Sequence, residues 1–381
     1  MRAFRLIATL FVKEFIQIRR DPISLGMLLV LPAFLLILFG YALTFDVRHL
    51  AIGVCDQDRS AASRELIRRF NLTEYFDLAV QADDPRELTR LIDQEAIRVG
   101  LVIPSDFEKR LQAGQAAPVQ LLIDGTNATI ASAVTGYAEA IIQAFSRQVL
   151  LERALHYGQR LPAFAVSVEA RIWYNPELQS ARFLVPGLIA FLLMVTTVIA
   201  TSLSVTRERE RGTMEQLVLA PLKPYQLVLG KTLPYLLVAI GATGLILLVS
   251  QILFNVSVRG TPAVLALVVV LYLLAGLGQG LLISTIASSQ QVAFQIAILS
   301  TLLPTFILSG FVFPIYNMPP VIQAITYLVP ARYFLTALRG VMLKGTGLAV
   351  FWPEVLLLLA FAVLTLTLSS LRLRRLFHHL L

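Results

Sequence analysis

The segment Gly230-Lys231-Thr232 has residue types that hold phosphate groups in nucleotide-hydrolysing proteins. Such a loop also needs a glycine five positions before its Gly-Lys pair, because only then can backbone amides wrap the phosphates. That position is Tyr225, and the segment begins a long apolar stretch instead of joining a strand to a helix. The sequence therefore argues against nucleotide binding here, and we expect Lys231 to extend its ammonium group to a membrane interface.

Other groups that could perform catalysis are dispersed along the chain. The histidines are not spaced with acids or a nucleophile as a catalytic site requires: His49, His156, His378 and His379. Cys55 is the only cysteine, so the chain can form neither an intrachain disulfide nor a cysteine-cluster metal site. We predict no catalytic residue, no metal site and no cofactor in this chain, and we expect Cys55 to be a small core residue.

A run of alternating charge reads Arg207-Glu208-Arg209-Glu210-Arg211-Gly212-Thr213-Met214-Glu215-Gln216-Leu217. Arg211 is one helical turn from both Arg207 and Glu215, so charges can pair along a helix. Gly212 permits a break, and Thr213 can cap a short second helix. An apolar face of the kind that docks in a partner's groove follows, at i, i+3, i+4 and i+7: Met214, Leu217, Val218 and Pro221. A solvated turn that only sets membrane topology is the alternative.

The composition is that of a membrane protein. Hydrophobic residues make up 57% of the 381 residues and charged residues 15%, against about 25% charged in soluble domains. Residues 44–180 contain 14 Lys/Arg and 18 Asp/Glu, a net charge of −4, and the rest of the chain contains 18 and 6, a net charge of +12. Basic clusters beside apolar stretches indicate cytoplasmic loops, and the lack of a folded basic face argues against nucleic-acid binding.

Residues 1–22 predict an amphipathic interfacial helix. One face carries Phe4, Ile7, Phe11, Phe15 and Ile18, and the other carries Arg5, Thr9, Lys13, Gln17 and Arg20. The n-region of a signal peptide is the alternative, which the regular two-faced pattern weakens. Residues 23–45 contain no charge and are long enough to cross a hydrocarbon core of about 30 Å. Because basic residues precede this first span, its N-terminal end is expected in the cytoplasm.

Residues 46–178 have the composition of a water-exposed domain and alternate strand and helix patterns. This predicts an α/β domain inserted between the first and second spans, on the extracytoplasmic side. The expected strands are Leu50–Cys55, Phe76–Val80, Ile97–Ile103, Val119–Ile123 and Phe164–Trp173. The expected helices are Ser60–Phe70, Pro85–Gln94, Ser105–Gln112 and Asn127–His156.

Residues 179–381 predict a membrane domain with five further transmembrane helices, at about 183–205, 225–254, 262–287, 292–314 and 351–371. Residues 206–224 form its cytoplasmic loop. Residues 315–350 are too apolar for an ordinary loop, and Pro314, Pro319, Pro320 and Pro330 divide them into pieces too short to cross. We expect an external re-entrant segment there. The predicted fold class is an α-helical integral membrane protein with six transmembrane helices and both termini in the cytoplasm.

The interiors of the spans contain almost no ionisable residues, since Lys231 and Glu354 lie near ends. This disfavours a proton- or ion-coupled pump, which needs buried acids or bases. Several polar residues do lie in the spans and are candidates for lining a substrate pathway: Thr196, Thr197, Thr201, Gln279, Ser284, Gln295 and Thr305. Hydrogen bonding between helices is the alternative role for them.

The charged run from Glu208 to Leu217, followed by Pro221, resembles the cytoplasmic loop of type-2 ABC exporter permeases. The resemblance extends over nearly the whole chain. It includes the N-terminal interfacial helix, the large insertion after the first span and the stretch Ser309-Gly310-Phe311-Val312-Phe313-Pro314. The insertion is similar to that of bacterial drug-efflux-like members.

The resemblance implies a coupling segment that contacts a separate ATPase subunit, with the N-terminal helix beside it: Arg207, Glu208, Arg209, Glu210, Arg211, Gly212, Thr213 and Glu215. It implies re-entrant helices from Pro314 to Leu343 at the external end of the pathway. ATP and Mg²⁺ are expected on the partner ATPase. A second permease copy or a paralogue is expected to complete an exporter of amphiphilic or drug-like substrates in a bacterial inner membrane. A periplasmic adaptor and an outer-membrane channel are further candidate partners.

Two other function classes remain open. A non-transporting membrane receptor or scaffold would use the external α/β domain to bind a periplasmic partner. An ATPase gene beside this one would favour export, and its absence would favour the scaffold. A membrane-embedded enzyme is disfavoured for want of any catalytic group.

Overall fold

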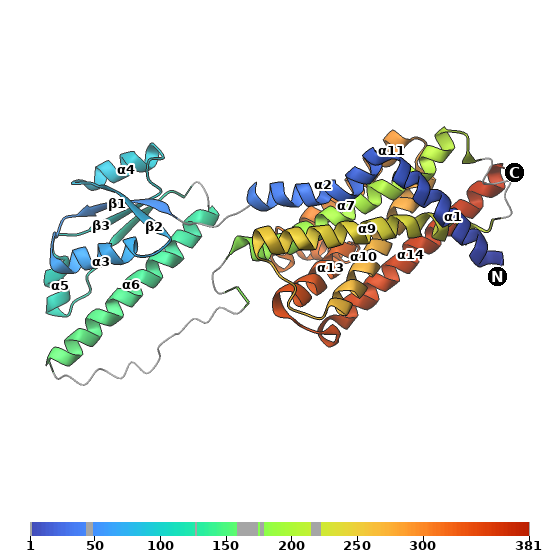
Figure 1. The fold of residues 1–381 in the computed structure, drawn as a ribbon. Coiled ribbons are helices and arrows are strands. Elements are labelled where there is room, and N and C mark those ends of the chain that lie inside the picture. The colour runs from blue at the N-terminus through green and yellow to red at the C-terminus, as the bar shows by residue number, and fades with distance from the viewer. Residues whose placement is uncertain are drawn as a thin grey trace. The chain divides into compact units, whose positions relative to one another are not determined.

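The computed structural model describes the backbone of residues 2–42, 49–125, 128–157, 174–175, 179–214 and 222–380. Within these ranges it describes only the backbone, and not the side chains, of residues 2–4, 23–24, 128–129, 152–157 and 378–380. The chain divides into two compact units. A helical unit comprises Met1–Thr44 and Ile172–Leu381, and an α/β unit comprises Phe45–Arg171 (Figure 1).

Among the described residues, six helical segments of the helical unit are long and apolar enough to cross a membrane, in agreement with the predicted number, and a bent pair of short helices (Pro320–Thr326 and Pro330–Lys344) would make a seventh if it counts as one span. An amphipathic helix, α1 (Arg2–Arg20), precedes them. The segments lie in α2 (Pro22–Ala42), α7 (Ser180–Glu210), α9 (Pro224–Phe254), α10 (Pro262–Ile286), α11 (Gln290–Leu303) with the π-helical turn η1 (Pro304–Leu308), and α14 (Leu348–Leu380). Helix α1 and the end of α14 lie at the same end of the unit (Figure 1).

Several helix ends differ from the predicted boundaries. Helices α7 and α14 continue beyond the predicted ends of their spans, because charged residues extend each helix past its apolar part. The fifth span ends at Leu308 and not at residue 314, since Gly310 adopts a left-handed conformation with φ +81° that ends the helix. The predicted end of the first span at Phe45 lies outside the described residues.

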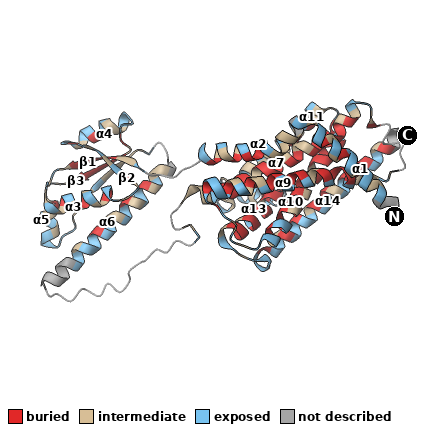
Figure 2. Ribbon diagram, viewed as in Figure 1, coloured by how far each residue is buried: buried red, intermediate tan, exposed pale blue. Residues whose placement is uncertain are grey.

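Helices α7 and α10 form the centre of the bundle. In each of them 67% of the residues in the most apolar 18-residue stretch are buried, against 22% in the corresponding stretches of α2, α11 and α14 (Figure 2). Two glycines let these helices approach closely. A Cβ on Gly276 would lie 2.6 Å from the Thr197 hydroxyl, and one on Gly280 would lie 2.1 Å from the Thr201 hydroxyl. Small residues at such contacts are the usual basis of helix packing in membranes.

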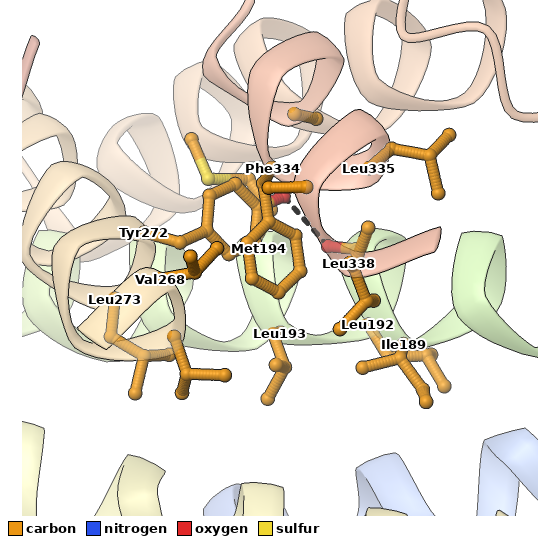
Figure 3. Close-up of a cluster of buried hydrophobic side chains, with 14 of the residues drawn as sticks. Ile189, Leu192, Leu193, Met194, Val268, Tyr272, Leu273, Phe334, Leu335 and Leu338 are labelled. Atoms are coloured by element: carbon orange, nitrogen blue, oxygen red, sulfur yellow. Dashed lines mark hydrogen bonds between the residues drawn. The ribbon is translucent and has the colours of Figure 1, made fainter. Parts of the chain in front are cut away.

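The proline-rich stretch between the fifth and sixth spans forms short helices. They are η2 (Ile315–Asn317), α12 (Pro320–Thr326) and α13 (Pro330–Arg339) with the π-helical turn η3 (Gly340–Lys344), and α12 and α13 are bent by 82°. Figure 3 shows the apolar side of α13 inserted into the bundle, where Phe334 stacks on Tyr272 at 3.8 Å between ring centroids. The Tyr272 hydroxyl donates to the Ala190 carbonyl at 2.8 Å.

The described residues of the α/β unit form a four-stranded sheet in the order β2-β1-β3-β4. Strand β1 (Leu50–Asp56) pairs in parallel with β2 (Phe76–Gln81) and β3 (Val99–Ile103), and β4 (Gln120–Ile123) is antiparallel to β3. The helices are α3 (Ala61–Asn71), α4 (Pro85–Asp93), α5 (Phe107–Ala113) and α6 (Ala128–Tyr157). The strand expected at Phe164–Trp173 lies outside the described residues.

Two apolar clusters cover the sheet. One joins it to α3, α5 and α6 through residues such as Leu66, Phe107 and Phe145, and the other joins it to α4 through Leu88. Cys55 belongs to the second cluster and is fully buried, which confirms its predicted place in a core. Burial raises the pKa of its thiol, and the nearby carboxylates of Asp84, Asp83 and Asp56 raise that pKa further.

This environment predicts that Cys55 reacts slowly with iodoacetamide. A raised pKa lowers the thiolate fraction at pH 8, and burial allows reaction only during local opening. We expect alkylation of the native full-length chain to be at least about tenfold slower than that of the urea-unfolded chain. A Gln57→Cys variant in a Cys55→Ser background is the control, because Gln57 is exposed. Equal alkylation rates for Cys55 and the control would contradict this account of the core.

Candidate functional site

The described part of the charged run, Arg207 to Met214, forms the last turn of α7 and the turn that follows it. Gly212 has φ +69° and ends the helix. The Gly212 amide donates to the Arg209 carbonyl at 3.2 Å, and the Thr213 amide donates to the Glu208 carbonyl at 3.0 Å. These two bonds form a Schellman motif, whose left-handed residue is normally glycine because a Cβ is disfavoured there. Gly212 therefore sets the direction in which the chain leaves α7.

Part of the predicted coupling segment lies outside the described residues. Glu215 and the apolar positions Leu217, Val218 and Pro221 fall in this part. The predicted pairing of Arg211 with Glu215 and the predicted second helix therefore stay predictions. The Thr213 hydroxyl, expected to cap that helix, donates back to the Glu208 carbonyl at 3.2 Å.

Glu208 lies in a buried cluster of two acids and two lysines. Its Oε2 is 2.8 Å from Nζ of Lys231, and its Oε1 accepts a hydrogen bond from Nζ of Lys13 at 2.9 Å. Lys231 also donates to Oε1 of Glu14 at 3.0 Å. Lys13 comes within 3.6 Å of the same Glu14 oxygen. The cluster joins α1, α7 and α9 and has no net formal charge.

Burial of these charged groups costs desolvation free energy, which pairing with opposite charges must offset. Glu14 is 3% exposed, Glu208 5% and Lys231 2%. The prediction that Lys231 reaches a membrane interface is therefore wrong, because its ammonium group lies between two buried carboxylates. Removing one partner of a buried ion pair typically costs about 3–5 kcal/mol, since a charge is left without its counterion.

The other charged residues at the end of α7 contact the neighbouring helices. Arg207 is 3.4 Å from a carboxylate oxygen of Asp21, which separates α1 from α2. Arg209 donates to the carbonyl of Ala287 at 2.9 Å, at the C-terminus of α10. Glu210 accepts from the backbone amide of Gln290 at 2.7 Å, at the N-terminus of α11. A cation at a helix C-terminus and an anion at an N-terminus both complement the helix dipole.

Three residues of this turn face outward: Glu210, Arg211 and Gly212 are exposed. Among the described contacts, the Arg211 side chain forms neither a hydrogen bond nor an ion pair. The described coupling residues thus divide into two sets. Arg207 to Glu210 contact neighbouring helices and form the anchored set, and Arg211 and Gly212 form an exposed tip.

Helix α1 contacts the bundle through a stripe that differs from the predicted apolar face. Leu10, Glu14 and Ile18 are buried, whereas Phe11 and Phe15 are only half-buried. Leu10 packs against the backbone of Gly230, where an added Cβ would lie 2.6 Å from the leucine Cβ. Gly230 is thus a packing position in a helix, in line with the rejection of a phosphate-binding loop.

A largely apolar cavity of about 340 Å³ lies beside the charged end of α7. Side chains of α1, α2, α7, α9 and α11 line it, among them Leu31, Ile199 and Phe294. Its polar lining comes from residues that include the Asp21–Arg207 pair. A cavity with an apolar wall and a few polar groups matches an amphiphilic molecule.

The predicted pathway residues do not gather at one place. Thr196 lines the cavity of about 340 Å³, Gln295 is exposed and Thr305 is buried. Gln279 approaches Ser300 on α11 at 3.5 Å. The buried hydroxyls of the remaining three donate to carbonyls of their own helices: Thr197, Thr201 and Ser284.

Sequence reasoning missed the acidic partners of the cluster. Glu14, and Asp21 outside the cluster, were given no partner, although both are acids in or beside an otherwise basic and apolar helix. Of the six acids outside residues 44–180, five fall in two short segments of the sequence, 14–21 and 208–215: Glu14, Asp21, Glu208, Glu210 and Glu215. That concentration was the available signal for a paired site.

Comparisons with known proteins identify similar chains. The model of the "ABC-2 family transporter protein" family matches residues 22–371. The chain is 38% identical to "Probable multidrug ABC transporter permease YbhS" of Escherichia coli (strain K12), over 98% of both chains. It is 34% identical to "Probable multidrug ABC transporter permease YbhR" of the same organism, over 95% of this chain and 96% of the relative. It is also 28% identical to "Inner membrane transport permease YhhJ" over 98% of both.

The buried cluster predicts a large loss of stability in a Lys231→Met variant. The change leaves the half-exposed Lys13 as the remaining cation beside Glu14 and Glu208, and breaking a buried ion pair costs about 3–5 kcal/mol. The matched control is Lys13→Met, whose side chain is 46% exposed, so that its ion pair contributes about 0–1 kcal/mol. The measurement is the melting temperature of the detergent-solubilised chain. Equal melting temperatures for the two variants would show that the cluster does not stabilise the bundle.

Proposed function

The chain belongs to the ABC-2 family of transporter proteins, and we propose that it is the transmembrane permease subunit of an ATP-driven exporter. The match covers residues 22–371 and therefore includes both units of the chain. The names of the relatives YbhS and YbhR describe those proteins as multidrug permeases, which supports the same role here.

The observation that carries this proposal is the way in which one turn anchors several helices. The end of α7 contacts α1 and α9 through Glu208, the α1–α2 junction through Arg207, and the α10–α11 turn through Arg209 and Glu210. A displacement of the exposed tip is therefore transmitted to all of these elements together. This is the mechanical requirement for coupling ATP-driven closure of a partner to rearrangement of the membrane helices.

The partner that supplies this displacement is proposed to be a separate ABC ATPase subunit, which binds ATP and Mg²⁺. The described part of the chain offers no phosphate-binding loop at Gly230, since that residue packs within α9 against Leu10. The exposed tip at Arg211 and Gly212 is the proposed contact with the ATPase. A second copy of the chain or a paralogue would complete the transporter. A periplasmic adaptor and an outer-membrane channel are further proposed partners.

The proposed substrates are amphiphilic or drug-like molecules that leave the cytoplasm or the inner membrane. The cavity of about 340 Å³ supports this class, because its wall is largely apolar and its polar groups include Thr196, Gln17 and Tyr235. Residues at this cavity, rather than all of the polar residues of the spans, are proposed to receive the substrate.

The proposed orientation in a bacterial inner membrane has both termini in the cytoplasm and residues 46–178 outside. Basic residues at both ends of the chain support it, since Lys and Arg accumulate on the cytoplasmic side. The bent segment that contains Pro314, Pro319 and Pro330 is then proposed to be a re-entrant segment at the external end.

Charge reversal at the exposed tip tests the coupling role. We expect Arg211→Glu to lower ATP-dependent efflux of a fluorescent amphiphilic dye by about tenfold, within the usual range of coupling free energies of about 1–3 kcal/mol. The chain is co-expressed with a candidate ABC ATPase subunit, and the melting temperature is expected to stay unchanged because Arg211 is exposed. Arg374→Glu, an equally exposed reversal on α14, is the control. Unchanged efflux and ATPase activity in the Arg211 variant would remove the coupling role.

Cysteine labelling tests the proposed orientation. Gln57→Cys and Arg374→Cys are made separately in a Cys55→Ser background, since both positions are exposed. A membrane-impermeant maleimide should label the position-57 variant in cells with a permeabilised outer membrane. It should label the position-374 variant only after lysis. The opposite pattern would invert the proposed topology.

A further inference from the structure

Helix α13 has two chemically different faces. Tyr333, Phe334 and Leu338 are buried in the bundle core, where Figure 3 shows Phe334 and Leu338 among apolar side chains. Three polar residues form a second stripe at i, i+4 and i+7: Arg332, Thr336 and Arg339. This spacing places them on one side of the helix. A helix in an apolar bundle therefore presents two arginines along one face.

Both arginines line a cavity of about 570 Å³. The other walls come from α12 through Gln323, from the turn after η1 through Ser309, and from the start of α7 through Phe183. The cavity is thus built from elements that are far apart in sequence. Apart from the two arginines, the polar residues that line the cavity are uncharged.

Within the part of the chain that the structure describes, the contacts of the Arg339 guanidinium are all with neutral groups. It donates to the carbonyls of Gly310 at 3.1 Å, Phe183 at 3.4 Å and Phe311 at 3.5 Å. Its guanidinium carbon lies 4.2 Å from the centre of the Phe183 ring. Its Nε is buried without a hydrogen-bond partner. These contacts fix the side chain but leave its positive charge uncompensated.

Arg332 has the same kind of surroundings. It donates to the Thr326 hydroxyl and to the Gln323 carbonyl, and its guanidinium carbon lies 3.8 Å from the centre of the Tyr327 ring. It also lies in the first turn of α13, where the helix dipole disfavours a cation. Nothing in these contacts neutralises the second charge.

The acid nearest in sequence to these arginines is Glu354, and the ion pairs of the described residues do not include it. Residues 216–353 contain no Asp or Glu, and neither arginine takes part in an ion pair among the described residues. The contrast with Lys231, which contacts two carboxylates, is direct. Two guanidinium groups that have no counterion among the described residues attract an anion strongly, because Arg binds carboxylate and phosphate oxygens through paired N–H donors.

The rest of the lining is apolar or aromatic, with Pro314, Ile315 and Tyr316 beside the arginines. Tyr316 is 80% exposed, so the aromatic part is accessible from outside the helical unit. We propose that this cavity binds the anionic head group of an amphiphile, of the phosphate or carboxylate type, between Arg332 and Arg339. The proposal concerns binding alone and holds whether or not the chain exports its substrates.

The test is lipid retention by the purified full-length chain, measured by native mass spectrometry. The probes are phosphatidylglycerol, phosphatidylcholine with the same acyl chains, and inorganic phosphate. We expect phosphatidylglycerol to be retained in preference to phosphatidylcholine, and Arg332→Gln to weaken its binding by about tenfold, the loss expected for one charge-assisted contact. Arg332→Lys should restore part of the binding because it keeps the charge. The substitution is made at Arg332 because Arg339 donates hydrogen bonds to three backbone carbonyls, so a change at Arg339 would also remove structural contacts.

The matched control is Arg259→Gln. Arg259 is exposed in the helical unit and is not part of the cavity lining. Retention that depends on Arg332 but not on Arg259 supports the site. Inorganic phosphate that binds with the same Arg332 dependence, without a preference between the lipids, would assign the same site to a soluble anion. Equal retention of both lipids together with phosphate binding that ignores Arg332 would overturn the proposal.

Discussion

The structure of the helical unit depends on one buried ammonium group. Lys231 lies on α9 within 3.0 Å of carboxylates from α1 and α7, and such a charge is stable in an apolar bundle only when it is fully paired. The rotations of α1, α7 and α9 must therefore present Glu14, Glu208 and Lys231 to one another. Apolar packing alone is non-directional and would tolerate other rotations. The cluster specifies one arrangement of these three helices.

The same turn organises its surroundings through helix ends. Arg209 contacts the C-terminus of α10 and Glu210 the N-terminus of α11, so two adjacent residues with opposite charges match two opposite dipoles. The Schellman motif at Gly212 then ends α7 immediately beyond these contacts. A helix end that is fixed to several helices and is followed by an exposed turn has the geometry needed to transmit the movement of a bound partner to those helices.

The charged residues at the two ends of the bundle have different kinds of partner. At the end of α7, Arg207 is paired with Asp21, and Glu208 is paired with Lys13 and Lys231. At the cavity beside α13, Arg332 and Arg339 are held by carbonyls, a hydroxyl and aromatic rings. Paired charges favour a fixed structure, whereas uncompensated charges at a cavity favour an external ligand. This difference supports the proposal of mechanical coupling at one end and the proposal of anion binding at the other.

Patterns that are local in the chain were predictable. The six apolar segments, the strands β1 to β4 and the place of the charged run follow from hydropathy and from the spacing of residues, which need no knowledge of distant contacts. The glycine that ends α7 was also visible, because the left-handed conformation at Gly212 is a property of a single residue. The end of the fifth span was misjudged, since Gly310 and not Pro314 terminates the helix.

The partners of the charged residues could be decided only by the tertiary structure. Glu14 and Lys231 are 217 residues apart, and their contact depends on how two helices are rotated about their axes. Arg209 and Ala287 meet because α7 and α10 pack closely, which their sequences indicate only as small residues at unspecified places. By itself the sequence determined that charges collect at one end of an apolar bundle. The packing of the helices determined which of them are buried together and which remain exposed, because pairing across helices depends on distances in space.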